Sequence, residues 1–213
     1  MPVLGFGTWQ LMGSACYEAT AHALRTGYRH IDTAQAYGNE AEVGRAIAQS
    51  KVPRREVFLV TKLSNHGEYQ GPQLLARFAS QLKDLQTDYI DLYMLHSPGP
   101  SKELTLSAWR TMEQLYHEGR IRALGVSNFG RAELESLLAD ASVPPVYVQN
   151  KFSIYSPGEQ RIDTTRSLMG YLKEKGIATW TANLGKTQRW KDHEKYGVTC
   201  WASGACSSRP QVS

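Results

Sequence analysis

Short runs of apolar residues alternate with helical patterns along most of this chain, and this alternation restricts the possible folds more than any other feature. The run Val57–Val60 is unbroken, which is typical of a strand buried on both faces of a parallel sheet. In the pattern that follows it, Leu75, Phe78, Leu82 and Leu85 recur at three- and four-residue steps, which predicts one apolar helix face. The expected strands are Val3–Thr8, Tyr28–Asp32, Val57–Thr61, Tyr89–Leu95, Ile121–Val126, Val146–Val148 and Ile177–Thr181.

Strand–helix pairs repeated in this way indicate a parallel α/β protein, for which two architectures compete. A doubly wound sheet often carries a glycine-rich loop after its first strand, whereas Gly5 and Gly7 lie within the first strand and lack a third glycine. A barrel accommodates all the units. We therefore predict an α/β fold of the (β/α)8 TIM-barrel type, incomplete, with about seven βα units and the eighth strand missing.

The expected helix ends and the C-terminal segment complete this outline. Ser14 and Asn39 are candidate helix caps, and Gly27, Gly119 and Gly176 are candidate helix stops. After Leu184, Val198 and Val212 are the only branched aliphatic residues. We expect residues 1–185 to form the truncated barrel domain and residues 186–213 to form an atypical, poorly ordered tail.

Composition argues against several classes of function. The formal net charge of +4 comes from scattered lysines and arginines, so no nucleic-acid partner is expected. No stretch approaches the length of a membrane span, and no signal peptide is recognisable. The three cysteines, Cys16, Cys200 and Cys206, show no metal-ligand spacing. We expect a monomeric cytoplasmic protein without a bound metal.

Polar residues stand where the predicted strands end, which is where barrels carry their functional groups. Each has an ordinary alternative explanation, such as a helix cap for Asp32 or for the Ser127–Asn128 pair and a solvated surface position for Lys62. Their joint placement at successive strand ends favours a site. The candidates are Asp32, Lys62, His96, Ser127, Asn128 and Gln149, with Tyr37 in the loop after Asp32.

These residue types suit the reduction of a carbonyl group. A tyrosine hydroxyl, with its ordinary pKa near ~10, is a poor acid at neutral pH, and a nearby lysine ammonium lowers that pKa. A carboxylate keeps the lysine charged, and a histidine can hydrogen-bond the carbonyl oxygen. Tyr37 could then protonate the oxygen while hydride reaches the carbon. Because no side chain supplies hydride, a nicotinamide cofactor is implied.

Several segments resemble the aldo-keto reductase family, with their spacing preserved from Met1 to about Gly176. GYRHIDTAQAYGNE at Gly27–Glu40 is similar to the family's first signature almost residue for residue. The other similar segments are MPVLGFGTWQ at the N-terminus, VTKL at Val60–Leu63, YIDLYMLH at Tyr89–His96 and GRIRALGVSNF at Gly119–Phe129.

The resemblance implies a role for each matching residue. The family's catalytic tetrad falls on Asp32, Tyr37, Lys62 and His96, with Tyr37 as proton donor. NADPH is the cofactor by family habit, with NADH as the alternative, and a small carbonyl compound is the substrate. The implied cofactor-binding residues are Thr8, Asp32, Ser127, Asn128, Gln149 and Trp180, and the implied substrate-binding residues are Trp9, Tyr37 and His96.

The sequence also departs from the family pattern. Ser97 follows the histidine where the family often has an aromatic residue, and nothing after Gly185 matches the residues that grip the adenosine phosphate. Two hypotheses follow. The chain is an NADPH-dependent carbonyl reductase, or it is a truncated, non-catalytic family member with impaired cofactor binding that acts as an interaction protein or is inert.

Overall fold

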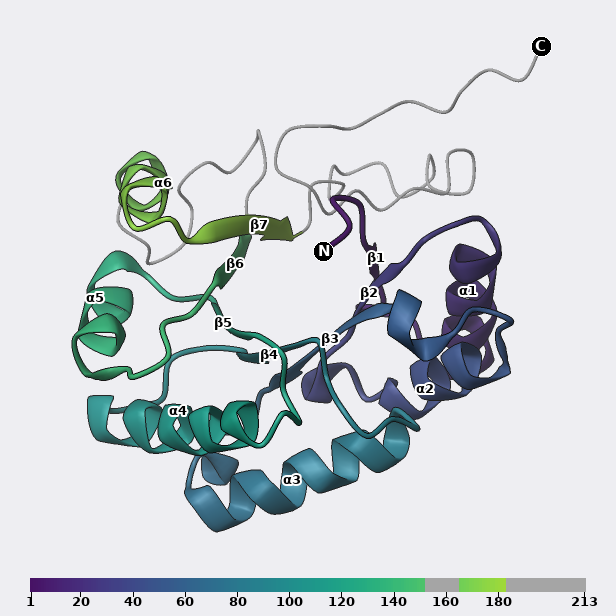
Figure 1. Cartoon of the computed structure of the whole chain (residues 1–213), viewed down its shortest axis with the longest axis horizontal. Coiled ribbons are helices and arrows are strands. Elements are labelled where there is room, and N and C mark those ends of the chain that lie inside the picture. Colours follow the sequence, from purple (N-terminus) through teal and green to yellow (C-terminus); the bar gives the residue numbers. More distant parts are fainter. Residues whose placement is uncertain (152–164, 183–213) are drawn as a thin grey trace.

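The seven strands form one parallel sheet whose strand order is the chain order, β1-β2-β3-β4-β5-β6-β7. The computed structural model describes residues 1–151 and 165–182. The sheet curls, and the helices lie on its outer side (Figure 1), so the predicted α/β fold of incomplete barrel type is confirmed. The strands are β1 (Phe6–Gly7), β2 (His30–Asp32), β3 (Phe58–Leu63), β4 (Leu92–Leu95), β5 (Leu124–Ser127), β6 (Tyr147–Lys151) and β7 (Ala178–Ala182).

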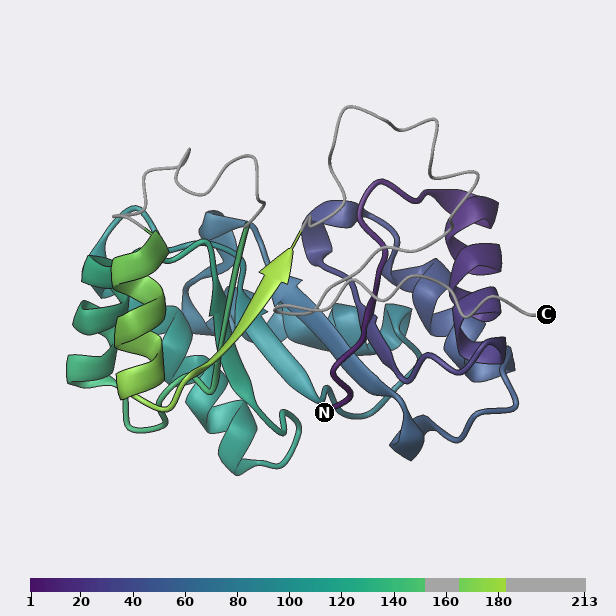
Figure 2. The same ribbon diagram turned by 90° about the horizontal axis from the view of Figure 1, so that it is seen from above.

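Each consecutive pair of strands is connected by a helix, which is the expected crossover for parallel neighbours. Seen from above, α1 and α2 lie at one side of the sheet and α5 and α6 at the other (Figure 2). The helices are α1 (Gly13–Arg25), α2 (Glu40–Gln49), α3 (Gly71–Asp84), α4 (Lys102–His117), α5 (Arg131–Asp140) and α6 (Thr165–Glu174).

Successive side chains of a strand point to opposite faces of the sheet, and the apolar ones form two separate clusters. In β3, Leu59 and Leu63 belong to the large buried cluster that also includes residues from the helices. Val60 instead joins Leu92 and Met94 in a separate small cluster. Because side chains alternate across a strand, Lys62 projects on the same side as Val60, into the interior of the curled sheet. The charged side chain of Lys62 therefore lies on the inner face of the sheet, near the carboxyl ends of the strands.

The helix stops follow the prediction, but two caps do not. Gly27, Gly119 and Gly176 have φ values of +99, +73 and +67°, the left-handed conformation that glycine adopts most readily. The Ser14 prediction is wrong, because α1 begins at Gly13 with Met12 at the N-cap position. Asn39 does precede α2, but its side chain caps no helical amide and bonds elsewhere.

The segment predicted to be a tail, residues 186–213, lies outside the described residues. Within the described ranges, no helix combines the length and the apolar character needed to cross a membrane.

Candidate active site

Four side chains from three strands and one turn meet at the carboxyl end of the sheet. Asp32 is the last residue of β2, and Tyr37 ends η1 (Gln35–Tyr37), a short 3-10 turn that follows it. Lys62 lies inside β3 and not after it as predicted, because β3 continues to Leu63 in register with β4. His96 directly follows β4, and its amide donates to the carbonyl oxygen of Leu63 at 2.9 Å.

The Lys62 ammonium is the centre of this group. Its Nζ lies 2.7 Å from Oδ1 of Asp32, 2.9 Å from the carbonyl oxygen of Thr33 and 3.4 Å from the hydroxyl of Tyr37. Both members of the Lys62–Asp32 ion pair are fully buried. Three donor hydrogens therefore meet three oxygens, which satisfies a charge that would otherwise be very unfavourable inside the protein.

The electrostatics of Tyr37 differ from the sequence-based expectation. Burial raises the pKa of the Tyr37 hydroxyl, the charge of Lys62 lowers it, and Asp32 raises it again, so that the net pKa lies above its ordinary value of 10.0. We expected Lys62 to make this phenol more acidic. Lys62 does act in that direction, but the cost of removing a phenolate from water outweighs it. Tyr37 is thus protonated at neutral pH.

Lys62 remains charged despite its complete burial. Desolvation would lower the pKa of its ammonium, but Asp32 and Tyr37 oppose that effect and the net pKa is raised above 10.5. A positive charge therefore stands beside the Tyr37 oxygen at neutral pH.

His96 lies edge-on to Tyr37, with ring centroids 5.6 Å apart and an interplanar angle of 76°. Its Nδ1 is 2.6 Å from Oγ of Ser64. Burial, helped by the positive charge of Lys62, lowers the pKa of His96 to about 3. The ring is consequently neutral at neutral pH and can offer one N–H donor and one acceptor nitrogen.

The polar residues of β5 and β6 lie next to this group. Ser127 is the last residue of β5 and is paired in register with Gln149, which lies within β6 and not at its end as predicted. Nε2 of Gln149 donates to Oδ2 of Asp32 at 3.1 Å. Asn128 is exposed, has a φ of +57°, and donates from Nδ2 to the carbonyl oxygen of His96 at 2.7 Å. The helix-cap explanation fails, since Gly130 occupies the N-cap of α5.

The remaining predicted residues lie on the two edge strands or directly after them. Thr8 follows β1, is fully buried, and donates from its backbone amide to the carbonyl oxygen of Asp32 at 3.0 Å. Trp9, the next residue in the chain, is 38% exposed. Trp180 lies in β7 opposite Gln149.

Asn39 and Ser64 support the site but were not predicted as part of it. Nδ2 of Asn39 donates to the carbonyl oxygens of Thr8 and Leu11, both at 2.8 Å. Its Oδ1 accepts from the Thr33 hydroxyl at 2.7 Å. Asn39 therefore ties the loop after β1 to the end of β2. The sequence offered only its position before a helix, which suggested a cap.

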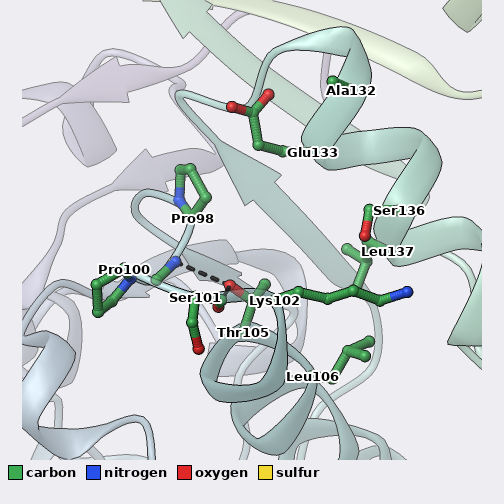
Figure 3. A pocket seen from close by; sticks show the side chains of 11 residues that line it. Pro98, Pro100, Ser101, Lys102, Thr105, Leu106, Ala132, Glu133, Ser136 and Leu137 are labelled. Carbon is green, nitrogen blue, oxygen red and sulfur yellow. Dashed lines mark hydrogen bonds between the residues drawn. The ribbon is translucent and has the colours of Figure 1, made fainter.

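A cavity of about 300 Å³ is lined by the loop from Pro98 to Ser101 and by residues of α4 and α5 (Figure 3). None of the predicted site residues lines it. The turn beside it is closed by the Gly99 amide, which donates to Oγ1 of Thr105 at 2.9 Å. Within the described part of the chain, no group of three or more His, Cys, Asp or Glu residues could hold a metal ion.

A curled parallel sheet with ionisable groups gathered at the carboxyl ends of its strands is the arrangement of an incomplete (β/α)8 barrel. The model of the aldo/keto reductase family matches residues 3–186, and the chain belongs to that family.

Comparisons with individual proteins agree with this assignment. The chain is 42% identical over 179 residues to the glyoxal reductase of Bacillus subtilis, covering 83% of this chain and 61% of that protein. It is 40% identical over 161 residues to methylglyoxal reductase DkgA of Escherichia coli, covering 76% and 57%. Among solved structures, the aldo-keto reductase MGS-M4 from a deep-sea metagenome matches with a TM-score of 0.81 and 38% identity, covering 90% of this chain and 67% of that one. The chain thus spans about three fifths of the length of these curated relatives.

Proposed function

We propose that this chain reduces an aldehyde or ketone to an alcohol with NADPH, with Tyr37 as the proton donor and NADH as the alternative cofactor. The observation that carries the proposal is the position of one buried ammonium, Lys62 Nζ, 2.7 Å from Asp32 Oδ1 and 3.4 Å from the Tyr37 hydroxyl. His96 completes the group from the next strand.

The arrangement suits proton donation at the moment when charge develops. Tyr37 is protonated before reaction because its pKa is raised. When hydride reaches the carbonyl carbon, the oxygen gains alkoxide character and becomes a stronger base than a phenolate. The proton then moves from the Tyr37 hydroxyl to that oxygen, and the fixed charge of Lys62 stabilises the phenolate that remains.

His96 serves as an uncharged hydrogen-bond donor to the same oxygen. With its pKa at about 3, it does not itself supply the proton at neutral pH. Its contribution is to orient the carbonyl group and to stabilise developing negative charge from a preorganised position.

The polar residues of β5 and β6, together with Asn128 directly after β5, fit the amide end of a nicotinamide. Asn128 is exposed, and its Nδ2 is already engaged with His96 and Ser127, which leaves Oδ1 as the acceptor available to a carboxamide N–H. Ser127 and Gln149 lie in register on the adjoining strands. Thr8, Asp32 and Trp180 are the remaining residues that we assign to cofactor binding. The cofactor, when bound, supplies the hydride.

We infer a small polar carbonyl compound as substrate. Ser97 follows His96, and its Oγ lies 2.8 Å from Nε2 of His66, so this side of the site is polar and small. Trp9 is the exposed aromatic residue that we assign to the opposite side. We further propose a cytoplasmic monomer without a nucleic-acid partner.

Replacing Tyr37 with Phe tests the proton donor. We expect aldehyde-dependent oxidation of NADPH to be lost, while NADPH still raises the melting temperature because the cofactor contacts do not involve the hydroxyl. The matched control is Tyr17→Phe, which removes an exposed hydroxyl of α1 that donates to Gln49 of α2 and should leave turnover unchanged.

Two results would count against the proposal, and one would invalidate the assay. Full turnover by Tyr37→Phe would reject the assignment of the proton donor. Loss of activity in Tyr17→Phe would show that the assay reports folding. If neither NADPH nor NADH raises the melting temperature of the unmodified chain, the non-catalytic interpretation is correct.

A further inference from the structure

We propose that Ser64 is a positioning residue, whose hydroxyl holds His96 in the tautomer that carries its hydrogen on Nε2 and keeps that N–H facing the substrate oxygen. The inference rests on the proposed function only for its role in turnover. The contact itself is short, with 2.6 Å between Ser64 Oγ and His96 Nδ1.

The contacts of Ser64 favour donation from its hydroxyl to His96 Nδ1, because the other contact of Oγ already supplies a donor. The backbone amide of Ala36 donates to Ser64 Oγ at 3.3 Å, and an amide can only donate. Within the described residues, Nδ1 of His96 is then the acceptor that the Ser64 hydroxyl hydrogen can reach. A ring nitrogen that accepts carries no hydrogen, so in the proposed arrangement the neutral His96 ring carries its hydrogen on Nε2.

The loop that carries Ser64 is itself anchored. Oε1 of Gln35 accepts from the Ser64 amide at 2.8 Å, while its Nε2 donates to Glu68 at 2.7 Å. Glu68 is in turn ion-paired with Arg77 at 2.6 Å. Because Gln35 is held at both ends of its amide, the Ser64 main chain has a defined position, and its hydroxyl needs little reorganisation to meet His96.

The main chain of His96 is likewise held by hydrogen bonds, but these bonds do not determine the tautomer of its ring. Its amide donates to Leu63, and its carbonyl oxygen accepts from Asn128 at 2.7 Å. Neither contact distinguishes the two ring nitrogens. The contact with Ser64 does, and it links the end of β3 to the residue that follows β4.

The tautomer of His96 decides whether its Nε2 attracts or repels the carbonyl oxygen of the substrate. With the hydrogen on Nε2, the ring donates to a carbonyl oxygen and stabilises the charge that develops there. With the hydrogen on Nδ1, the Nε2 lone pair would face that oxygen. Removing the Ser64 hydroxyl should therefore lower kcat while NADPH binding is retained.

The imidazole nitrogens can be observed directly by ¹⁵N NMR of the full chain without cofactor, with His96→Gln used to assign its signals. We expect the wild-type chain to show His96 protonated on Nε2 and accepting at Nδ1. Ser64→Ala should shift the Nδ1 signal and populate the second tautomer, whereas Ser64→Thr, which keeps a hydroxyl, should restore the wild-type pattern. Ser97→Ala removes a neighbouring hydroxyl that contacts His66 and should leave His96 unchanged.

Turnover gives a second readout. Ser64→Ala should lower kcat about tenfold, the effect of losing one hydrogen bond of ordinary strength, with an unchanged NADPH-induced thermal shift. A wild-type spectrum with Nδ1 protonated would overturn the proposal, even if Ser64→Ala fails to fold. So would a Ser64→Ala spectrum identical to wild type. If the chain shows no turnover at all, the proposed function fails, while the tautomer measurement still decides the role of Ser64.

Discussion

Removing the positive charge from Lys62 should destabilise the fold strongly, because Asp32 would then be a buried carboxylate without a counter-ion. Both side chains are fully buried, and their contact is 2.7 Å. In the Lys62→Met variant, Gln149 still donates to Asp32, at 3.1 Å. Leaving one partner of a buried ion pair uncompensated costs about 3–5 kcal/mol. Urea unfolding of the cofactor-free chain at neutral pH would measure this loss.

A double-mutant cycle separates the charge from the packing. Asp32→Asn alone leaves the ammonium unpaired, so it should also cost several kcal/mol, whereas the combination with Lys62→Met leaves neither charge. We expect the double variant to lose at least ~2 kcal/mol less than the sum of the single losses. The matched control is Lys102→Met, which breaks an exposed ion pair with Asp140 and should cost at most ~1 kcal/mol. Additive losses in the free energy of unfolding, or equal losses for the Lys62 and Lys102 variants, would show that an uncompensated buried charge is not the cause.

Two further predictions concern stability. Gly44→Ala should cost roughly 3 kcal/mol or more in urea unfolding, because the added Cβ would clash with the carbonyl oxygen of Asp84 in α3. The control Gly170→Ala adds a Cβ that meets nothing within 4 Å, so it should be neutral or stabilising. Burial lowers the pKa of His30 from 6.5 to about 4. As the pH falls, the unfolded chain therefore binds a proton at this residue before the folded chain does, and the free energy of unfolding should fall by about 3 kcal/mol between pH 6.5 and pH 4. His30→Leu should remove that part of the pH dependence, and an unchanged profile would contradict it.

The order and direction of the strands could be predicted because each is a local apolar run bounded by helical patterns. Parallel strands joined by helices then bring their carboxyl ends together, which is why residues as distant as Asp32 and His96 could be expected at one site. Strand limits were less predictable. β1 is only Phe6–Gly7 and β6 extends to Lys151, because each length depends on the hydrogen-bonding neighbour and not on the apolar run itself.

Side-chain partners that depend on tertiary structure could not be read from local spacing. Asn39 looked like a helix cap, yet its amide bonds to Thr8, 31 residues earlier in the chain. Ser64 had no local signal at all, since its partner His96 lies 32 residues away. The raised pKa of Tyr37 was also missed, because its largest cause is burial and a sequence pattern does not show how deeply a hydroxyl is buried.

Transfer of deuterium is the most direct test of the central claim, that the Tyr37–Lys62–Asp32–His96 group reduces a carbonyl with hydride from a nicotinamide. The chain would be incubated with NADPH deuterated at the transferable position and a small aldehyde, and the alcohol analysed by mass spectrometry. We expect deuterium on the former carbonyl carbon with the unmodified chain and none above background with Tyr37→Phe. An unlabelled alcohol, or no alcohol while NADPH raises the melting temperature, would contradict it.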